Sequence, residues 1–419
     1  MPSTDPSDLA LLDTVQRQTL RYFWDFAHPA CGLARERSNA PFGYGPEVVT
    51  TGGTGFGVLA IIVGVERGWI TREAATARLL RAVRFLWDAD AYHGVFPHFL
   101  NGDTGRTVRF TRKDDGGDIV ETSFLMAGLL CARQYFDRTD PAEAELRQRI
   151  DWLWNDVEWR WHTKEGTEDV LYWHWSPNNG WSMNHAIRGW NECLITYVLA
   201  ASSPRYAILP DVYHRGWAGG PAFRNGKSFY GVELPLGPDL GGPMFFAHYS
   251  FLFLDPRGLS DRYADYWRQN VAHALINHRY CVENPKGWKG YGPDCWGLTA
   301  CDNHEGYNAH APDNDLGVIA PTAALASLPY VPELSLRALR HFHGPMRERI
   351  WGEYGFRDAF NETLAWFAES YLAIDQGPIV AMIENHRSGL LWRLFMSCPE
   401  VRAGLDRLGF EVGTGGAVA

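Results

Sequence analysis

Hydrophobic residues recur three and four positions apart along most of the chain, which is the spacing of an amphipathic helix. This pattern predicts about a dozen helices, at 8–26, 56–65, 72–89, 118–135, 141–154, 182–199, 243–254, 260–276, 318–328, 332–343, 363–374 and 378–397. Consecutive helices in up-and-down pairs can bury their apolar faces by closing into a two-layered ring. We therefore predict an all-α fold, a closed helical toroid that occupies residues 1–412 as a single domain, followed by a disordered tail at 413–419.

The segments between the predicted helices are long, glycine-rich and aromatic, and some of them resemble short strands. Residues 98–110 and 224–237 each contain an Asn-Gly pair, a sequence typical of a tight β-hairpin turn. We expect these short β-hairpins and long aromatic loops at one end of the toroid, around a central cleft. Aromatic side chains on loops are unfavourable unless they bind something flat.

Composition and charge limit the classes of molecule that the protein is expected to bind. The chain has 419 residues and a formal net charge of −10, with no run of Lys or Arg that could follow a phosphate backbone, so nucleic acid is excluded. No apolar stretch reaches transmembrane length and the first ten residues show no signal peptide. We therefore expect a cytoplasmic protein without a membrane partner, or a periplasmic one if the N-terminus is processed. Seven scattered cysteines without a CxxC pair indicate reduced thiols.

A dense acidic cluster precedes one of the predicted helices. Asp114, Asp115, Asp118 and Glu121 lie within eight residues, directly before an apolar run. Asp118 and Glu121 have the spacing of a capping box, which would give them a structural role at a helix start. Capping does not explain the other two acids, and crowded like charges raise the pKa of neighbouring carboxyls. Since a general acid must stay protonated near neutral pH, the structural and the catalytic interpretations both remain open.

The segment 172–195 combines four tryptophans with amide, imidazole and guanidinium groups. Sugars present flat C–H faces and a rim of hydroxyls, and they are bound by aromatic stacking together with such hydrogen-bonding groups. The candidate substrate-binding residues here are Trp173, Trp181, Asn184, His185, Arg188, Trp190 and Asn191, with Glu192 as a carboxylate partner. The alternative is that Ser182 caps a helix on which Arg188 and Glu192 form an ordinary surface ion pair.

Two later segments add five more candidate substrate-binding residues. Trp288, Trp296 and Tyr307 alternate with glycine and polar residues. The HExxH zinc signature is absent from that segment and its Asp-Asn-Asp run is too short for an EF-hand loop, so no metal is expected. Farther on, Glu369 is expected on an apolar helix, and Gln376 in a Gly-Pro turn that starts the next helix.

Four segments occur in one order along the chain: KDDGGDIVETSFLMAGLL, WSMNHAIRGWNE, CDNHEGYNAHAPDND and YLAIDQGPIVAMIENHRSGLLW. On these motifs, over about residues 14–398, the chain resembles the glycoamylase-like family of bacteria, which includes the endo-β-1,2-glucanases and sophorose-releasing enzymes of glycoside hydrolase family 144. The resemblance implies a single (α/α)6 barrel and carboxylate catalysis on β-linked glucan, with no cofactor. Carried over by motif, the catalytic residues are Asp118, Glu121, Asp114 and Glu192.

The resulting hypothesis is a glycoside hydrolase that takes a glucan oligosaccharide or polysaccharide, with neither cofactor nor metal. Three alternatives stay open. A transglycosylase on β-1,2-glucan would use the same residues. A glycan-binding toroid without turnover would need only the aromatic side chains. A magnesium-dependent isoprenoid synthase would use residues 114–118 as a DDxxD motif, although such a motif lies inside a helix and Gly116 and Gly117 disfavour one there.

Overall fold

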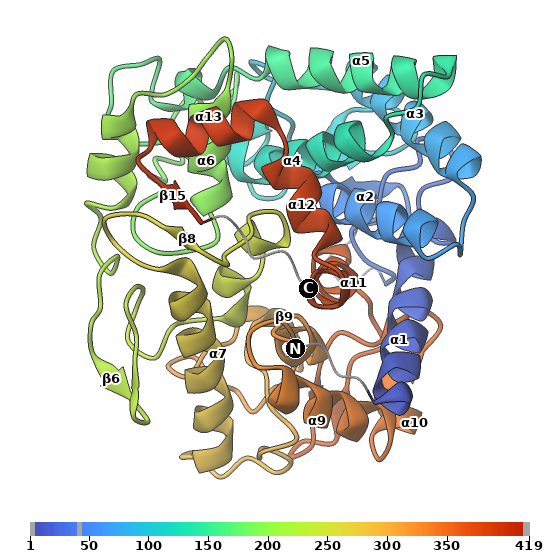
Figure 1. Ribbon diagram of the computed structural model, residues 1–419, viewed down its shortest axis with the longest axis vertical. Coiled ribbons are helices and arrows are strands. Elements are labelled where there is room, and N and C mark those ends of the chain that lie inside the picture. Colours follow the sequence, from blue (N-terminus) through green and yellow to red (C-terminus); the bar gives the residue numbers. More distant parts are fainter. Residues whose placement is uncertain (1–4, 40–43, 414–419) are drawn as a thin grey trace.

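Helices dominate the computed structural model of the protein, which describes residues 5–39 and 44–413 (Figure 1). Within those residues thirteen α-helices are joined by long loops with short paired strands. The helices are α1 (Pro6–Trp24), α2 (Thr51–Glu66), α3 (Arg72–Asp88), α4 (Ile119–Tyr135), α5 (Pro141–Asp156), α6 (Leu194–Ser202), α7 (Tyr266–Glu283), α8 (Pro321–Leu325), α9 (Pro332–His343), α10 (Arg347–Ile350), α11 (Ala373–Arg387), α12 (Leu390–Met396) and α13 (Pro399–Arg407). The strands are β1 (Val48–Thr50), β2 (Phe99–Asn101), β3 (Thr107–Val108), β4 (Gly117–Asp118), β5 (His174–Trp175), β6 (Ser228–Phe229), β7 (Val232–Glu233), β8 (Leu259–Ser260), β9 (Ala300–Asn303), β10 (Gly306–Ala309), β11 (Trp351–Gly352), β12 (Gly355–Phe356), β13 (Phe360–Asn361), β14 (Trp366–Phe367) and β15 (Glu411–Val412). The prediction of a helix-rich fold is confirmed.

Helices α2 and α4 pack closely against each other in the interior, and both are buried nearly throughout. Two glycines allow their close approach. A Cβ atom on Gly55 would lie 2.1 Å from the carbonyl oxygen of Phe124, and one on Gly128 would lie 2.3 Å from the carbonyl oxygen of Gly55. Since neither distance leaves room for a side chain, these helices can pack at this separation only with glycine at both positions.

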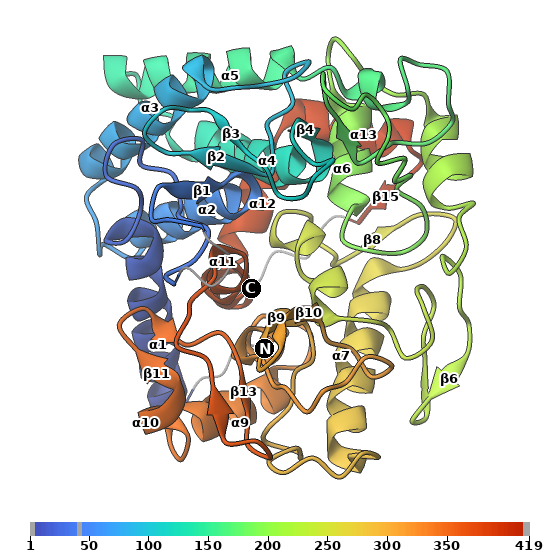
Figure 2. The ribbon, with the colours of Figure 1, turned by 180° about the vertical axis from the view of Figure 1, so that it is seen from behind.

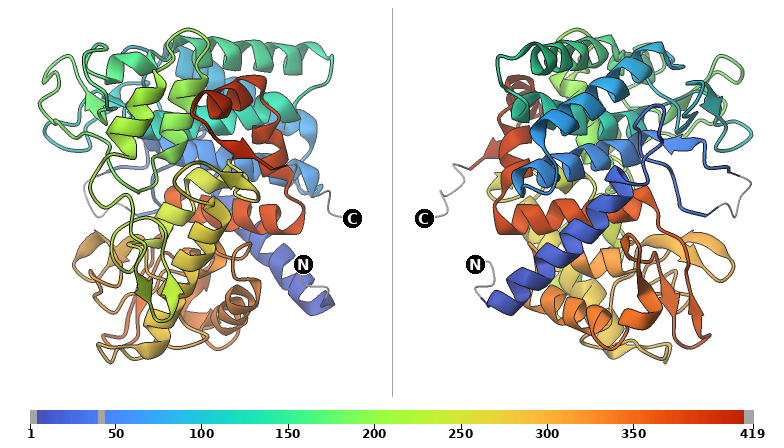
Figure 3. Two further views of the ribbon diagram at one scale, coloured as in Figure 1. Left: turned by 60° about the vertical axis from the view of Figure 1, so that its left-hand side comes forward. Right: turned by 90° about the vertical axis from the view of Figure 1, so that its right-hand side faces the viewer.

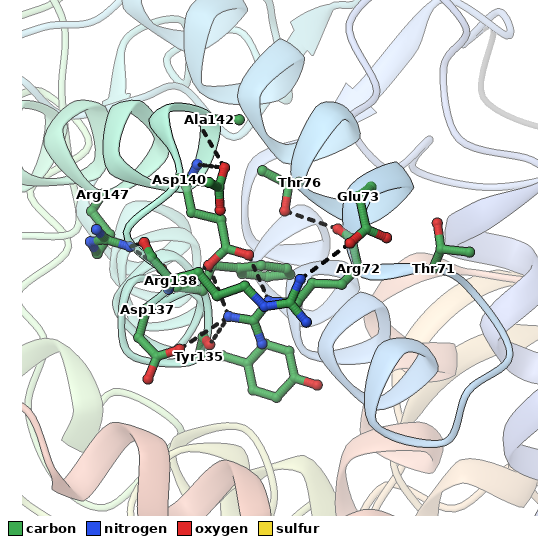
Figure 4. Close-up of polar contacts among 12 residues, drawn as sticks. Thr71, Arg72, Glu73, Thr76, Tyr135, Asp137, Arg138, Asp140, Ala142 and Arg147 are labelled. Carbon is green, nitrogen blue, oxygen red and sulfur yellow. Dashed lines mark hydrogen bonds and ion pairs between the residues drawn. The ribbon is translucent and has the colours of Figure 1, made fainter.

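Helices α3 and α5 form part of an outer layer, and each buries one face. At the start of α3, the Arg72 guanidinium donates hydrogen bonds of 2.6 and 2.8 Å to the Glu143 carboxylate at the start of α5 (Figure 4). Near the ends of the same helices, the rings of Trp87 and Trp152 contact each other with centroids 5.6 Å apart. The two helices therefore run in the same direction, and α4 connects them through the interior.

A continuous hydrophobic core extends from Leu12 in α1 to Phe410 after α13. The C-terminal segment closes onto it, because α13 packs on α6 and β15 pairs with β8. Gly413, the first residue of the predicted disordered tail, donates a hydrogen bond of 2.7 Å to the carbonyl oxygen of Gly258. Residues 414–419 lie outside the described part of the chain. Among the described helices, none has the length and apolarity needed to cross a bilayer.

Several helix predictions were wrong. Residues 182–193 form a loop, and α6 begins only at Leu194. The segment 243–254 contains two short 3-10 turns instead of an α-helix. Residues 363–372 contain the end of the hairpin β13–β14 and a loop. Many apolar residues of these segments are buried, but a helical spacing of apolar residues alone does not distinguish a buried loop from a helix.

The predicted Gly-Pro turn at 375–378 is also absent, because these residues lie inside α11, which begins at Ala373 and contains Pro378. Gly377 has a packing role instead. A Cβ atom there would lie 2.4 Å from the Cβ atom of Phe56 in α2. The close packing of α11 on α2 therefore overrides the local tendency to turn.

The predicted hairpin at 98–110 is present as β2 and β3, and β1 extends it to three strands. In 224–237 the strands β6 and β7 turn at Tyr230 and Gly231, both with positive φ, and not at the Asn-Gly pair as predicted. Strands β1 to β4 gather on the side that faces the viewer in Figure 2. Figure 3 shows that the start of α1 and the strand β15 lie on the opposite side.

Candidate active site

A cavity of about 570 Å³ lies where β2 and the first turns of α2 and α4 meet. The residues that line it include His98, Glu121, Trp173, Glu192, Tyr249 and Tyr307. They come from loops and helix starts far apart in the sequence. The predicted cleft therefore exists, with two of the predicted acids and two of the predicted aromatic residues in its wall.

Asp118 fixes the positions of its neighbours at the acidic end of the cavity through hydrogen bonds. One of its carboxylate oxygens accepts hydrogen bonds from the backbone N–H groups of Val120 and Glu121, which caps α4 as predicted. The other oxygen lies 3.0 Å from His98 Nδ1 and accepts a hydrogen bond of 3.0 Å from Trp173 Nε1. Burial opposes ionisation, but these hydrogen bonds and the charge of His98 outweigh it and lower the pKa of Asp118. Asp118 is therefore an ionised residue that orients its neighbours.

Glu121 follows one helical turn later and faces the cavity. Its Oε2 atom accepts a hydrogen bond of 2.8 Å from the backbone N–H of Gly52 at the start of α2, and its Oε1 atom lies 3.9 Å from His98 Nε2. Burial raises the pKa of Glu121, while His98 acts in the opposite direction and Asp118 raises it further. Both contacts of its oxygens favour the carboxylate form.

His98 was not among the predicted site residues. Its ring stacks on Phe110, with centroids 4.2 Å apart and planes 2° apart. Burial alone would lower its pKa, but Glu121 and Asp118 raise it to about 9, so the ring is a cation at neutral pH. One ring nitrogen of His98 and one carboxylate oxygen each from Asp114 and Asp118 lie within 4.8 Å of one another. This spacing could hold a metal ion. In its protonated form His98 balances the charge of the carboxylates, and it would have to lose that proton to act as a metal ligand.

Two carboxyls of the site have a pKa close to neutrality. Burial, with contributions from Glu121 and Asp118, raises the pKa of Glu192 to about 7. Burial and the charge of Asp118 also raise the pKa of Asp114 to about 7, although His98 opposes this. Asp114 Oδ1 lies 3.3 Å from His174 Nε2. Perturbed carboxyls gathered beside one cavity are typical of an acid–base catalytic centre.

The acids at 114–118 do not form the metal site of an isoprenoid synthase. Asp114 and Asp115 lie in the loop before β4, outside any helix. The Asp115 carboxylate accepts hydrogen bonds of 3.0 and 2.9 Å from the side-chain amides of Asn178 and Asn179, which ties this loop to the aromatic segment. Asp115 is therefore bound to partners other than those of Asp114 and Asp118, and the three aspartates do not act together as a DDxxD set.

The predicted substrate-binding residues fall into three groups, and the first lies at the cavity. Trp173 and Tyr307 line it, and the exposed His185 ring stacks on Trp173 with centroids 5.0 Å apart. Tyr249, which sequence reasoning missed, also lines the cavity, and its buried hydroxyl has no hydrogen-bond partner among the described residues. Such a hydroxyl is suited to a substrate hydroxyl group.

The second group does not line the cavity. Asn184 is exposed and accepts a hydrogen bond of 2.9 Å from Lys164, and Arg188 is also exposed. Asn191 accepts a hydrogen bond from the Cys193 N–H, so its side chain stabilises the loop before α6. Trp181 is half-buried in an aromatic cluster with Trp161, Tyr172 and Trp175. The predicted helix start at Ser182 is absent, so a helical pair of Arg188 and Glu192 is absent too.

The third group does not line the cavity, and most of its members have structural contacts. Trp190 and Trp296 are buried in the hydrophobic core. Trp288 donates a hydrogen bond of 2.8 Å to Asp315, a buried carboxylate that also binds two tyrosine hydroxyls. Gln376 is buried in α11 and donates to the carbonyl oxygen of Phe356. Glu369 is exposed in a loop and not on an apolar helix.

Comparison with known proteins shows similarity to proteins that are named for cleaving glucans. Residues 184–399 match the family model named Glycoamylase, which describes glucoamylases. The chain is 47% identical over 422 residues to the exo β-1,2-glucooligosaccharide sophorohydrolase (non-reducing end) of Parabacteroides distasonis, an alignment that covers 96% of this chain and 58% of that protein. The chain thus spans less than two thirds of that relative's length.

Solved structures agree with this match. The endo-β-1,2-glucanase of Chitinophaga pinensis, in complex with sophorotriose and glucose, superposes with a TM-score of 0.93 at 54% identity, covering 96% of this chain and 98% of that one. The endo-β-1,2-glucanase of Talaromyces funiculosus, in complex with sophorose, has a TM-score of 0.65 at 10% identity, covering 92% of this chain and 86% of that one. The second likeness concerns the fold alone.

Proposed function

Because the chain belongs to the Glycoamylase family, we propose that it is a glycoside hydrolase that cleaves β-1,2-glucan or its oligosaccharides. The observation that carries the proposal is that Glu121 and Glu192 face one aromatic-walled cavity from different environments. Hydrolysis of a glycoside needs one protonated carboxyl and one ionised carboxylate on either side of the bond. The relatives from Parabacteroides distasonis and Chitinophaga pinensis, both named for β-1,2-linked substrates, support the choice of linkage.

Glu192 is the proton donor in this mechanism. Its carboxyl lines the cavity, and burial raises its pKa to about 7, so a large fraction is protonated at neutral pH. It can therefore transfer a proton to the glycosidic oxygen as the bond to the anomeric carbon breaks. The neighbouring negative charges of Glu121 and Asp118 help to retain that proton until the oxygen needs it.

Glu121 is the base. The Gly52 N–H and the His98 cation both stabilise its carboxylate, so it can accept a proton from the water that attacks the anomeric carbon. His98 is held in place by Asp118 and by its stacking on Phe110. It acts on the reaction through Glu121, as a positioning residue that keeps the base ionised.

We also propose that the helices close into an (α/α)6 barrel. The interior helices α2 and α4 pack side by side, and the outer helices α3 and α5 run parallel to each other on top of them. This alternation of inner and outer helices is what two concentric layers require. The C-terminal ends of the outer helices then lead into the loops that build the cavity.

The test is hydrolysis of linear β-1,2-glucan and of short β-1,2-linked oligosaccharides, with chromatographic analysis of the products. We expect shortened chains, and a Glu192→Gln variant that folds normally but loses activity by at least about a hundredfold. Cellulose-type and β-1,3-glucans are the matched substrate controls. Lengthened or cyclised products would contradict hydrolysis in favour of transglycosylation, and binding without any product would contradict both.

A further inference from the structure

Two tryptophans stand out on the outer wall of the molecule. Of the 18 tryptophans, all within the described residues, only Trp87 and Trp152 are exposed, with 51% and 44% of their surface accessible. Their rings are neighbours, with centroids 5.6 Å apart and planes inclined by 50°. Isolated surface aromatics need no explanation, but a contacting pair of exposed tryptophans does.

The pair belongs to the last turns of two parallel outer helices. Trp87 lies one residue before the end of α3, and Trp152 lies four residues before the end of α5. An ion-paired network fixes the helices one turn earlier: Arg84 donates hydrogen bonds of 3.0 and 2.7 Å to Glu145. Arg149 donates to the same carboxylate at 2.6 Å and lies over the Trp152 ring, 5.9 Å from its centroid. The two rings are therefore held on rigid elements beside fixed guanidinium and carboxylate groups.

We propose that Trp87 and Trp152 form a second glucan-binding surface, separate from the catalytic cavity, which takes glucosyl units of a long β-linked chain. Two inclined indole rings can stack on successive sugar rings of a twisted chain, and the flanking Arg84, Glu145 and Arg149 can bond to equatorial hydroxyls. This inference rests on the proposed function, because it assumes that the substrate is a glucan.

The size of the pair argues against a protein partner. Two half-exposed indoles offer on the order of 200 Å² of apolar surface, whereas a stable protein interface buries about 800 Å² on each side. The surface on one side of the two rings is occupied by the ion pairs of Arg84 and Arg149 with Glu145, which limits the apolar area there. An area of this size matches one or two sugar rings.

The position of the pair suits a long substrate. The loop that follows α3 carries His98 and Asp118, and the loop that follows α5 carries Trp173 and Glu192. Both tryptophans are therefore on the wall of the molecule at the end where the cavity lies. A polymer bound there raises the local concentration of further segments of the same chain at the cavity, whereas a short oligosaccharide has nothing left to bind there.

The test compares the wild type with a Trp87→Ala/Trp152→Ala variant on polymer and on a short β-1,2-linked oligosaccharide. Tyr230→Ala, which removes an exposed aromatic ring from the β6–β7 turn, is the matched control. We expect the double variant to raise KM for the polymer about tenfold, with kcat for the oligosaccharide unchanged. Binding is measured separately in a Glu192→Gln background, by gel electrophoresis in the presence of linear β-1,2-glucan, so that the polymer stays intact.

The outcomes separate this inference from the proposed function. The inference would be overturned if the glucan gel retarded the Glu192→Gln variant equally with the two tryptophans intact and with both replaced by alanine. It would also be overturned if light scattering showed that the double variant changes the oligomeric state while its glucan binding stays the same. A double Trp→Tyr variant, which keeps two stacking rings, should retain most of the retardation. If the wild type cleaves no oligosaccharide at all, the proposed function fails, while the gel comparison still tests the binding surface.

Discussion

Replacing His98 by Gln tests the electrostatics of the proposed active site most directly. Glutamine keeps a planar hydrogen-bonding group beside Asp118 but removes the positive charge 3.9 Å from Glu121. At an effective dielectric constant of about 20, a charge at that distance contributes about 4 kcal/mol, equivalent to about 3 pKa units. The His98 side chain is 19% exposed, so solvent screens part of this, and we expect the pKa of Glu121 to rise by about 1 to 3 units.

The assay is the pH dependence of kcat/KM on a β-1,2-linked oligosaccharide. In the wild type the acidic limb reports ionisation of Glu121 and the alkaline limb reports loss of the Glu192 proton, whose pKa is about 7. Removing a neighbouring cation favours the neutral carboxyl, so the acidic limb of His98→Gln moves to higher pH. The pH of the alkaline limb changes by no more than about a few tenths of a unit. The bell-shaped pH profile of kcat/KM therefore becomes narrower and its maximum becomes lower.

The control is His214→Gln, which removes a histidine that bonds to Tyr263 and has none of the site carboxylates among its charged neighbours. It should leave both limbs in place. A His98→Gln enzyme that is slower at every pH, with an unmoved acidic limb, would refute the electrostatic role and leave His98 as a packing residue on Phe110. A lower melting temperature without a shift of the limb would mean the same.

Three further predictions concern the acids and the helix packing. Glu121→Gln should lower kcat for oligosaccharide hydrolysis by about a thousandfold. The melting temperature, measured by calorimetry, should change little. A variant that unfolds would support a purely structural role for Glu121. Burial raises the pKa of Asp358 to about 7 and holds the pKa of Asp375 well above its usual value. The stability that the neutral forms provide is therefore lost as pH rises from about 4 through 7 and beyond. Asp375→Asn should flatten the decline of melting temperature with rising pH, and an unchanged slope would contradict this. Gly55→Ala places a methyl group 2.1 Å from the Phe124 carbonyl oxygen and should lower the free energy of unfolding in urea by about 2 kcal/mol or more, whereas an unchanged midpoint would show that α2 and α4 can separate.

Local chemistry was enough to identify several elements and the acidic centre. The N-cap of α4 at Asp118 and the bounds of α9 follow from short-range signals, and both predictions are confirmed. Glu121 was selected for its cluster of neighbouring acids and Glu192 through the family resemblance, and both face the cavity. Their catalytic roles stay predictions.

The same signals did not decide which aromatic residues meet a ligand. Trp173, Trp190 and Trp296 all lie in segments rich in glycine and polar residues, yet only Trp173 lines the cavity and the other two are core residues. The burial of a loop residue depends on which helices, distant in the sequence, pack over it. The sequence of the loop itself does not indicate which helices these are. Gln376 was misplaced for the same reason, because the packing of α11 on α2 turned a predicted turn into helix.

By itself, the sequence determined that this protein is helical, where several of its helices begin, and that acidic residues cluster at 114–121, because caps, periodicity and charge clusters act over a few residues. The tertiary structure alone decided the protonation states. His98 becomes a cation, and Glu192 retains its proton to a pKa of about 7, only because the fold buries them beside Glu121 and Asp118. Burial and through-space charge depend on neighbours that are close in the fold and distant in the chain.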